Sequence, residues 1–207
     1  MKQRESIYER VDEMAITLRL PEPPLTEKTL LALSEANPGY RFERTAEGKL
    51  IVSPTGLFSS GGEGELFAQV RAWVETTGLG RAFPSSGGLT LPDTSIVAPD
   101  TTYVSNNRLS NMTPEDREGA YPRIIPNVVF ELLSPTDASV DVDEKVQRYH
   151  DNGVPLVVVI DPKIQVTELC RAGNDRVKLD RPIVEIGPEM PDFVLDVAAV
   201  IFASRDQ

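Results

Sequence analysis

The feature that most constrains the fold is a strand, a helix and a second strand in direct succession. Residues 127–134 contain an apolar run, VVFELL, that is typical of a strand buried on both faces of a sheet. Residues 139–152 predict a helix that ends at Asn152-Gly153, and PLVVVIDP (155–162) predicts the second strand. Strands joined in this way form a parallel βαβ unit, so the sequence predicts an α/β fold.

Hairpins surround this unit and predict a mixed sheet rather than a wholly parallel one. YRFERT and KLIVSP are alternating strands around the turn AEG, and QVTELCR with RVKLDRP predicts a second hairpin. Other predicted elements are a helix over 26–36, an amphipathic helix over 60–78 and one strand over 96–105. We therefore expect a mixed β-sheet flanked by helices, with additional β-hairpins.

The chain length suits one folded domain preceded by a short extension. PEPPLT (21–26) predicts a stiff connector, because its prolines restrict the backbone. We expect residues 1–25 to form an N-terminal extension and residues 26–207 to form a single domain. A domain of this size, in a chain with 40 % hydrophobic residues, can bury a sizeable core.

Composition narrows the setting in which the protein works. No apolar run approaches the roughly 20 residues of a membrane span, and the charged N-terminal stretch lacks the apolar centre of a secretory signal. The single cysteine, Cys170, excludes an internal disulfide and a cysteine-based zinc site. We therefore expect a cytoplasmic protein without a membrane partner. The net charge of -11 argues against binding nucleic acid through the overall electrostatic field of the protein. The phosphates repel a negative protein, and affinity for them normally comes from lysine and arginine.

Glu131 is the unexpected residue of the first buried strand. It shares one face with Val129 and Leu133, while the other face carries Val128, Phe130 and Leu132. An ionised carboxylate in this setting costs several kcal/mol unless it is paired, hydrogen-bonded or bound to a metal. A structural ion pair, or a strand end that reaches water, would explain it as well as a functional site would.

The helix that follows the strand carries a lysine on its apolar stripe. Val142, Lys145, Val146 and Tyr149 fall at helical spacings that place them on one face. A lysine is seldom placed on such a stripe, and this helix should fold back over the end of the strand that contains Glu131. Lys145 is therefore a candidate partner of Glu131. The alternative is a lysine at the edge of the stripe that extends to solvent.

Two further acidic residues could join these side chains. Asp100 follows Pro99 at the start of a β-rich run, where a turn aspartate is the common alternative. Glu65 flanks the apolar stripe of the 60–78 helix, where a solvated helix charge is the common alternative. Two carboxylates could hold Mg²⁺ or Mn²⁺, which would activate a water, and a lysine nearby could assist hydrolysis of a phosphoester.

The order of these motifs resembles a known family. VAPDTTYVS, VVFELLSPTD and EKVQRYHDNGVPLVVVIDP together resemble the Uma-type restriction endonuclease family of the PD-(D/E)XK nuclease superfamily. The resemblance covers residues 26–170 and includes KLIVSPTG with the helix after it. It implies a restriction-endonuclease-like fold.

The resemblance also implies roles for single residues. Asp100 and Glu131 correspond to the metal ligands of the superfamily, and the carbonyl of Leu132 would supply a third oxygen. The lysine of the plain motif would stand at position 133, which is a leucine here. The family is similar to members whose lysine has moved to the neighbouring helix, and this assigns the role to Lys145. Glu65 matches an additional helix acid, and Tyr149 would shape the site.

These roles imply a Mg²⁺- or Mn²⁺-dependent endonuclease that hydrolyses phosphodiester bonds in DNA. The alternative is a non-catalytic module, either nucleic-acid-associated or regulatory, that keeps the nuclease fold and the metal site. The acidic surface and the leucine at position 133 favour this alternative. A positive groove leading to the carboxylates would favour the nuclease, and a deep closed pocket would favour a hydrolase of small phosphoesters. By analogy with the fold, we expect a homodimer.

Overall fold

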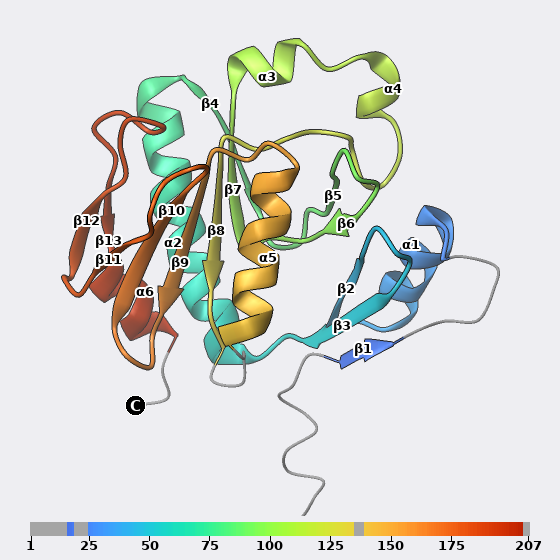
Figure 1. Ribbon diagram of the computed structural model, residues 1–207, viewed down its shortest axis with the longest axis horizontal. Helices are drawn as coiled ribbons and strands as arrows, with labels where there is room; N and C mark the ends of the chain where they lie inside the picture. Colours follow the sequence, from blue (N-terminus) through green and yellow to red (C-terminus); the bar gives the residue numbers. More distant parts are fainter. Residues whose placement is uncertain (1–15, 19–24, 135–138, 205–207) are drawn as a thin grey trace, which may run out of the picture.

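The computed structural model describes residues 16–18, 25–134 and 139–204 (Figure 1). Most of the expected N-terminal extension, residues 1–25, lies outside these ranges, and its described strand pairs with the body of the protein. None of the helices in the described ranges is both long and apolar enough to cross a membrane. The elements, in chain order, are β1 (Ile16–Leu18), α1 (Glu27–Ala36), β2 (Tyr40–Arg44), β3 (Leu50–Pro54), α2 (Leu57–Thr77), β4 (Gly80–Pro84), β5 (Leu89–Thr90), β6 (Ile96–Val97), β7 (Thr101–Ser105), α3 (Asn106–Ser110), α4 (Pro114–Arg117), β8 (Val128–Leu132), α5 (Ser139–Asp151), β9 (Leu156–Asp161), β10 (Val166–Arg171), β11 (Val177–Leu179), β12 (Ile183–Glu185), β13 (Val194–Asp196) and α6 (Val197–Ala203).

The larger sheet is mixed, as the sequence predicts. Its strand order is β11-β10-β9-β8-β7-β4, and β8 and β9 form its parallel pair, with Val128 opposite Leu156. The other neighbours in this sheet are antiparallel. Helix α5 connects the two parallel strands, which confirms the predicted βαβ unit.

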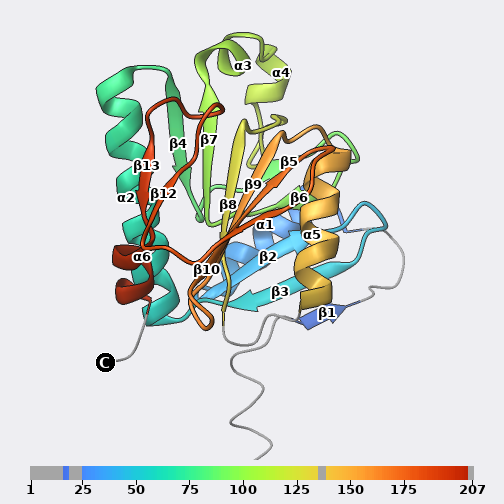
Figure 2. The same ribbon diagram turned by 60° about the vertical axis from the view of Figure 1, so that its left-hand side comes forward.

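Helices cover both faces of this sheet (Figures 1 and 2). Alternate residues of β8 point to opposite faces, so Phe130 packs in one core cluster and Val129 in another. The first cluster includes the α2 residues Leu66, Val70, Trp73 and Val74, and the second includes the α5 residues Val146 and Tyr149. The double burial explains why β8 and β9 are continuous apolar runs.

A second sheet, with strand order β1-β3-β2-β6-β5, lies beside α5 (Figure 1). The predicted hairpin of β2 and β3 is present, with Arg44 opposite Leu50. The single strand predicted over 96–105 is wrong. The chain divides at Pro99 into β6 of this sheet and β7 of the larger sheet. Proline has no N–H to donate to a ladder, and the N–H of Ala98 donates to the Glu43 side chain instead, 2.6 Å away.

Two glycines allow α2 to approach its neighbours closely. A Cβ added at Gly61 would lie 2.6 Å from the carbonyl oxygen of Ala203, and one at Gly62 would lie 2.6 Å from the Leu132 side chain. A Cβ added at Gly64, one turn further on, would meet nothing within 4 Å. The glycines at 61 and 62 therefore serve packing, whereas the glycine at 64 has no such role.

Alanine substitutions at Gly61 and Gly64 should have opposite effects on the stability of the protein. Gly61→Ala should lower the free energy of unfolding by about 1–3 kcal/mol, because the backbone of α6 must shift. Gly64→Ala should raise it by about 0.5–1 kcal/mol, because alanine favours the helix where space is open. Urea denaturation measures both. Equal stability of the two variants would contradict the close approach of α2 and α6.

Candidate active site

Asp100 and Glu131 lie at the adjoining ends of two paired strands. Strands β7 and β8 pair with Thr101 opposite Phe130, which places the next residues, Asp100 and Glu131, side by side. Both are buried, with exposed fractions of 4 % and 6 %. The backbone N–H of Leu132 donates to Oδ2 of Asp100 at 2.7 Å, so the strand itself fixes this carboxylate.

Helix α5 supplies two partners for Glu131. The ammonium of Lys145 lies 2.8 Å from Oε2, and the hydroxyl of Tyr149 donates to Oε1 at 2.7 Å. These residues are four apart on α5, so they project from one face of the helix. The structure thus brings together four predicted site residues, Asp100, Glu131, Lys145 and Tyr149, and both oxygens of the buried Glu131 carboxylate are hydrogen-bonded.

Strand β2 of the other sheet adds two residues that sequence reasoning missed. The guanidinium of Arg41 bridges Oδ1 of Asp100 at 2.7 Å and Oε2 of Glu63 at 2.8 Å. Glu43 accepts the N–H of Ala98 through one oxygen, and its other oxygen lies 4.0 Å from the Lys145 ammonium. Arg41 and Glu43 alternate along β2 and therefore point to the same face.

The structure does not bring Glu65 to this cluster. Its carboxylate accepts a hydrogen bond from the Gln69 side chain at 2.9 Å, and Gln69 also contacts the backbone of Asp196. Two positions along a helix differ by about 200° around its axis, so Glu63 and Glu65 point in nearly opposite directions. Glu63, rather than Glu65, is the α2 acid that reaches the cluster through Arg41.

The electrostatics of the cluster follow from an excess of carboxylates. Burial raises the pKa of Glu131 to about 7, and the carboxylates of Asp100 and Glu43 add to the rise against the opposing effect of Lys145. Burial alone would lower the pKa of Lys145, but Glu131 and Glu43 outweigh it and raise this pKa. The neighbouring carboxylates therefore favour the ammonium form of Lys145. Burial and Glu131 raise the pKa of Tyr149, which stays a neutral donor.

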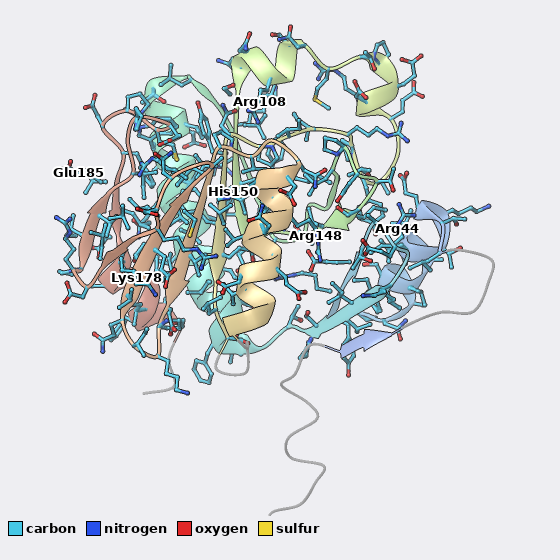
Figure 3. The ribbon with its side chains drawn as sticks, in the orientation of Figure 1. Arg44, Arg108, Arg148, His150, Lys178 and Glu185 are labelled. Carbon is cyan, nitrogen blue, oxygen red and sulfur yellow. The ribbon has the colours of Figure 1, made fainter. Side chains whose placement is uncertain are left out.

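A groove of about 650 Å³ lies between α5 and the β2–β3 hairpin and exposes part of this cluster. Glu43, Glu131 and Lys145 line it, whereas Asp100 and Arg41 are not among its lining residues. Arg148 lies on the side of α5 that faces the hairpin (Figure 3). The charged side chains of the groove are Glu43, Glu47, Asp93, Glu131, Glu144 and Asp151 on the acidic side and Lys49, Lys145 and Arg148 on the basic side.

The donor atoms of the cluster fit a hard divalent cation. Mg²⁺ takes oxygen ligands, keeps several waters and needs only one or two carboxylates. Asp100 and Glu131 supply such a pair, although the described residues contain no set of three His, Cys, Asp or Glu side chains arranged for a metal. Four carboxylates (Glu43, Glu63, Asp100 and Glu131) face two cationic side chains. Full ionisation would leave two negative charges unbalanced, which a divalent ion would neutralise.

Comparisons with known proteins agree with this fold. A crystal structure described as "a putative nuclease belonging to DUF820", from Anabaena variabilis, covers 88 % of this chain and 100 % of its own, with a TM-score of 0.69 and 22 % identity. At this identity the likeness shows a shared fold. A cryo-electron microscopy structure of a DrdV–DNA complex covers 70 % of this chain and 13 % of its own, at 13 % identity. Its TM-score of 0.34 is too low to indicate a shared fold.

No curated protein matches the sequence. A family model does match it: the model of the Uma2 family, described as "Putative restriction endonuclease", aligns with residues 27–198. The match confirms the resemblance that the motifs indicate. Because it spans most of the chain, this protein belongs to the Uma2 family.

Proposed function

We propose that this protein is a divalent-metal-dependent nuclease that hydrolyses phosphodiester bonds in DNA. The observation that carries the proposal is the juxtaposition of Asp100 and Glu131 with Lys145 bonded to Glu131 at 2.8 Å. Family membership supports a nuclease role. The metal, the substrate and the residue roles are parts of the proposal.

Each residue has a distinct part in this proposal. Asp100 and Glu131 would hold the metal, and the Leu132 carbonyl would supply an additional oxygen. A bound Mg²⁺ would lower the pKa of a water and neutralise charge on the phosphoryl group. Lys145, whose ammonium form the neighbouring carboxylates favour, would stabilise negative charge that develops on a phosphate oxygen. Tyr149 positions Glu131 through its hydroxyl.

The charge of the groove bears on substrate binding. Acidic side chains outnumber basic ones among the lining residues, so the groove is not the positive channel that a typical DNA-binding surface provides. Lys49 and Arg148 lie on its two walls and are the side chains available for phosphate contacts there, beside Lys145. This acidity favours a second candidate, a non-catalytic module of the nuclease fold that binds a basic partner.

Cleavage assays should distinguish the two candidates. Incubation with Mg²⁺ or Mn²⁺ should convert supercoiled plasmid to nicked and linear forms, and EDTA should abolish the conversion, because the carboxylates alone cannot stabilise the charge of the reacting phosphate. Agarose gels measure the products, and single-stranded DNA is tested in parallel. Asp100→Asn, purified identically, controls for contaminating nucleases. An intact substrate under every metal condition would contradict the nuclease proposal and favour the module.

The homodimer and the cytoplasmic location that the sequence predicts stay predictions. A dimer would place two such sites on one duplex, so that both strands could be cut in one binding event. The assay above also bears on this point, since a single site that cuts only one strand would accumulate nicked plasmid.

A further inference from the structure

Arg41 is not among the predicted site residues, yet it contacts one of them directly. Its guanidinium forms two ion pairs at once, with Asp100 at 2.7 Å and with Glu63 at 2.8 Å. The side chains of the two carboxylates are only 5 % and 14 % exposed, and that of Arg41 is 19 % exposed. A short, largely buried fork of this kind is strong, because charge-assisted hydrogen bonds gain from the low local dielectric.

The fork takes up the free side of Asp100. One oxygen, Oδ2, accepts the N–H of Leu132 and is fixed by the strand. The other oxygen, Oδ1, accepts from Arg41. A divalent ion that approached Oδ1 would meet a guanidinium already in contact with it, and two cations at such distances repel strongly in a buried setting.

The positions of Asp100 and Arg41 relative to the groove also indicate that Arg41 shields Asp100. Glu131 and Lys145 line the groove, but neither Asp100 nor Arg41 is among the lining residues. The side chain of Arg41 crosses from β2 of the five-stranded sheet to the start of β7 in the six-stranded sheet. Arg41 therefore covers the side of Asp100 that faces the other sheet, whereas Glu131 lines the groove.

We propose that Arg41 is a positioning residue that acts as the resting counter-ion of the metal site: it holds Asp100 and Glu63 in place until a divalent cation displaces it from Asp100. This inference rests on the proposed function. A divalent cation in place of Arg41 would supply two positive charges instead of one. It would therefore balance more of the negative charge of the carboxylates around Asp100. Arg41 thus preserves the geometry of the carboxylates before metal binding and at the same time weakens metal binding.

The test is metal affinity rather than cleavage. Isothermal titration calorimetry with Mn²⁺ alone should show that Arg41→Gln binds the ion about tenfold or more tightly than the wild type, because a repelling cation is gone. Arg71→Gln is the matched control: it removes the same charge from an exposed ion pair with Glu75 on α2 and should leave the affinity unchanged. A purely structural arginine would lower stability without raising metal affinity.

A second measurement uses the wild-type protein, so it does not depend on how the variant folds. The Nε–Hε cross-peak of Arg41 in a ¹⁵N–¹H NMR spectrum, assigned with Arg41→Lys, should shift on addition of Mg²⁺, while that of Arg71 should not. A cross-peak that stays fixed at saturating Mg²⁺ would overturn the inference.

The calorimetric outcomes also separate this inference from the proposed function. If the wild type binds Mn²⁺, Asp100→Asn does not, and Arg41→Gln binds no more tightly than the wild type, only the role of Arg41 is wrong. If neither the wild type nor Arg41→Gln binds Mn²⁺, the metal site and the inference both fail. Binding that appears only in Arg41→Gln would overturn the inference, because the arginine of the wild type would then not be displaced by the cation.

Discussion

Glu131→Gln should reduce the rate of metal-dependent DNA cleavage by about a hundredfold or more. The substitution keeps the shape of the side chain but removes the charge that would hold the metal beside Asp100. The two partners of Glu131 bond different oxygens, so the glutamine carbonyl can accept from the Lys145 ammonium while its amide N–H donates to the Tyr149 hydroxyl oxygen, and the local packing is retained. Initial rates of plasmid nicking at saturating Mg²⁺ measure the effect.

The control for this variant lies on the groove wall. Glu144→Gln removes an acidic charge from an exposed α5 residue that lines the same groove, and it should leave the rate within about twofold, as exposed charges contribute little. In EDTA, Glu131→Gln should unfold with a free energy within about 1 kcal/mol of the wild type, because it relieves part of the carboxylate excess. Cleavage that survives in Glu131→Gln would disprove the assignment of the metal site.

Lys145→Gln should also lose about a hundredfold or more in cleavage rate, but for a different reason. The ammonium would stabilise the charge that develops on the phosphate, and glutamine supplies only a neutral dipole. The same nicking assay measures the rate. Lys49→Gln, on the opposite wall of the groove, is the matched control and should reduce the rate far less, through weaker DNA binding alone.

Stability should separate the two active-site variants. Lys145→Gln leaves Glu131 and Glu43 buried without their shared cation, so its free energy of unfolding in EDTA should fall by about 2 kcal/mol. Addition of Mg²⁺ should restore part of this loss. Chemical denaturation with and without Mg²⁺ measures the change. Equal stability of Lys145→Gln and wild type in EDTA would show that the ammonium does not compensate these carboxylates.

The parts of the site that could be predicted are those carried by the βαβ unit. A carboxylate inside a doubly buried strand and a lysine on the inner stripe of the next helix are each anomalous in their own element. Glu131 and Lys145 therefore stand out by local pattern alone, and the chain connection between them is short enough to imply contact. The same periodicity places Tyr149 on the stripe.

The rest depends on contacts between elements that are far apart in sequence. Arg41 and Glu43 alternate with Phe42 along β2, a pattern that is also typical of a strand with one solvated face. Only the docking of the second sheet against β7 and α5 buries them. On α2, the choice between Glu63 and Glu65 depends on which side of the helix faces Arg41, and the apolar stripe does not specify this.

The path of the chain through Pro99 has an evolutionary consequence. Asp100 follows the last strand of one sheet and precedes the first residue of β7 in the other, so it belongs structurally to both. Substitutions in β2 can change the ion pairs of Asp100, while Glu131 on β8 and Lys145 on α5 stay unchanged. Under the proposed function, evolution could therefore alter metal affinity through β2 without changing the residues that β8 and α5 contribute.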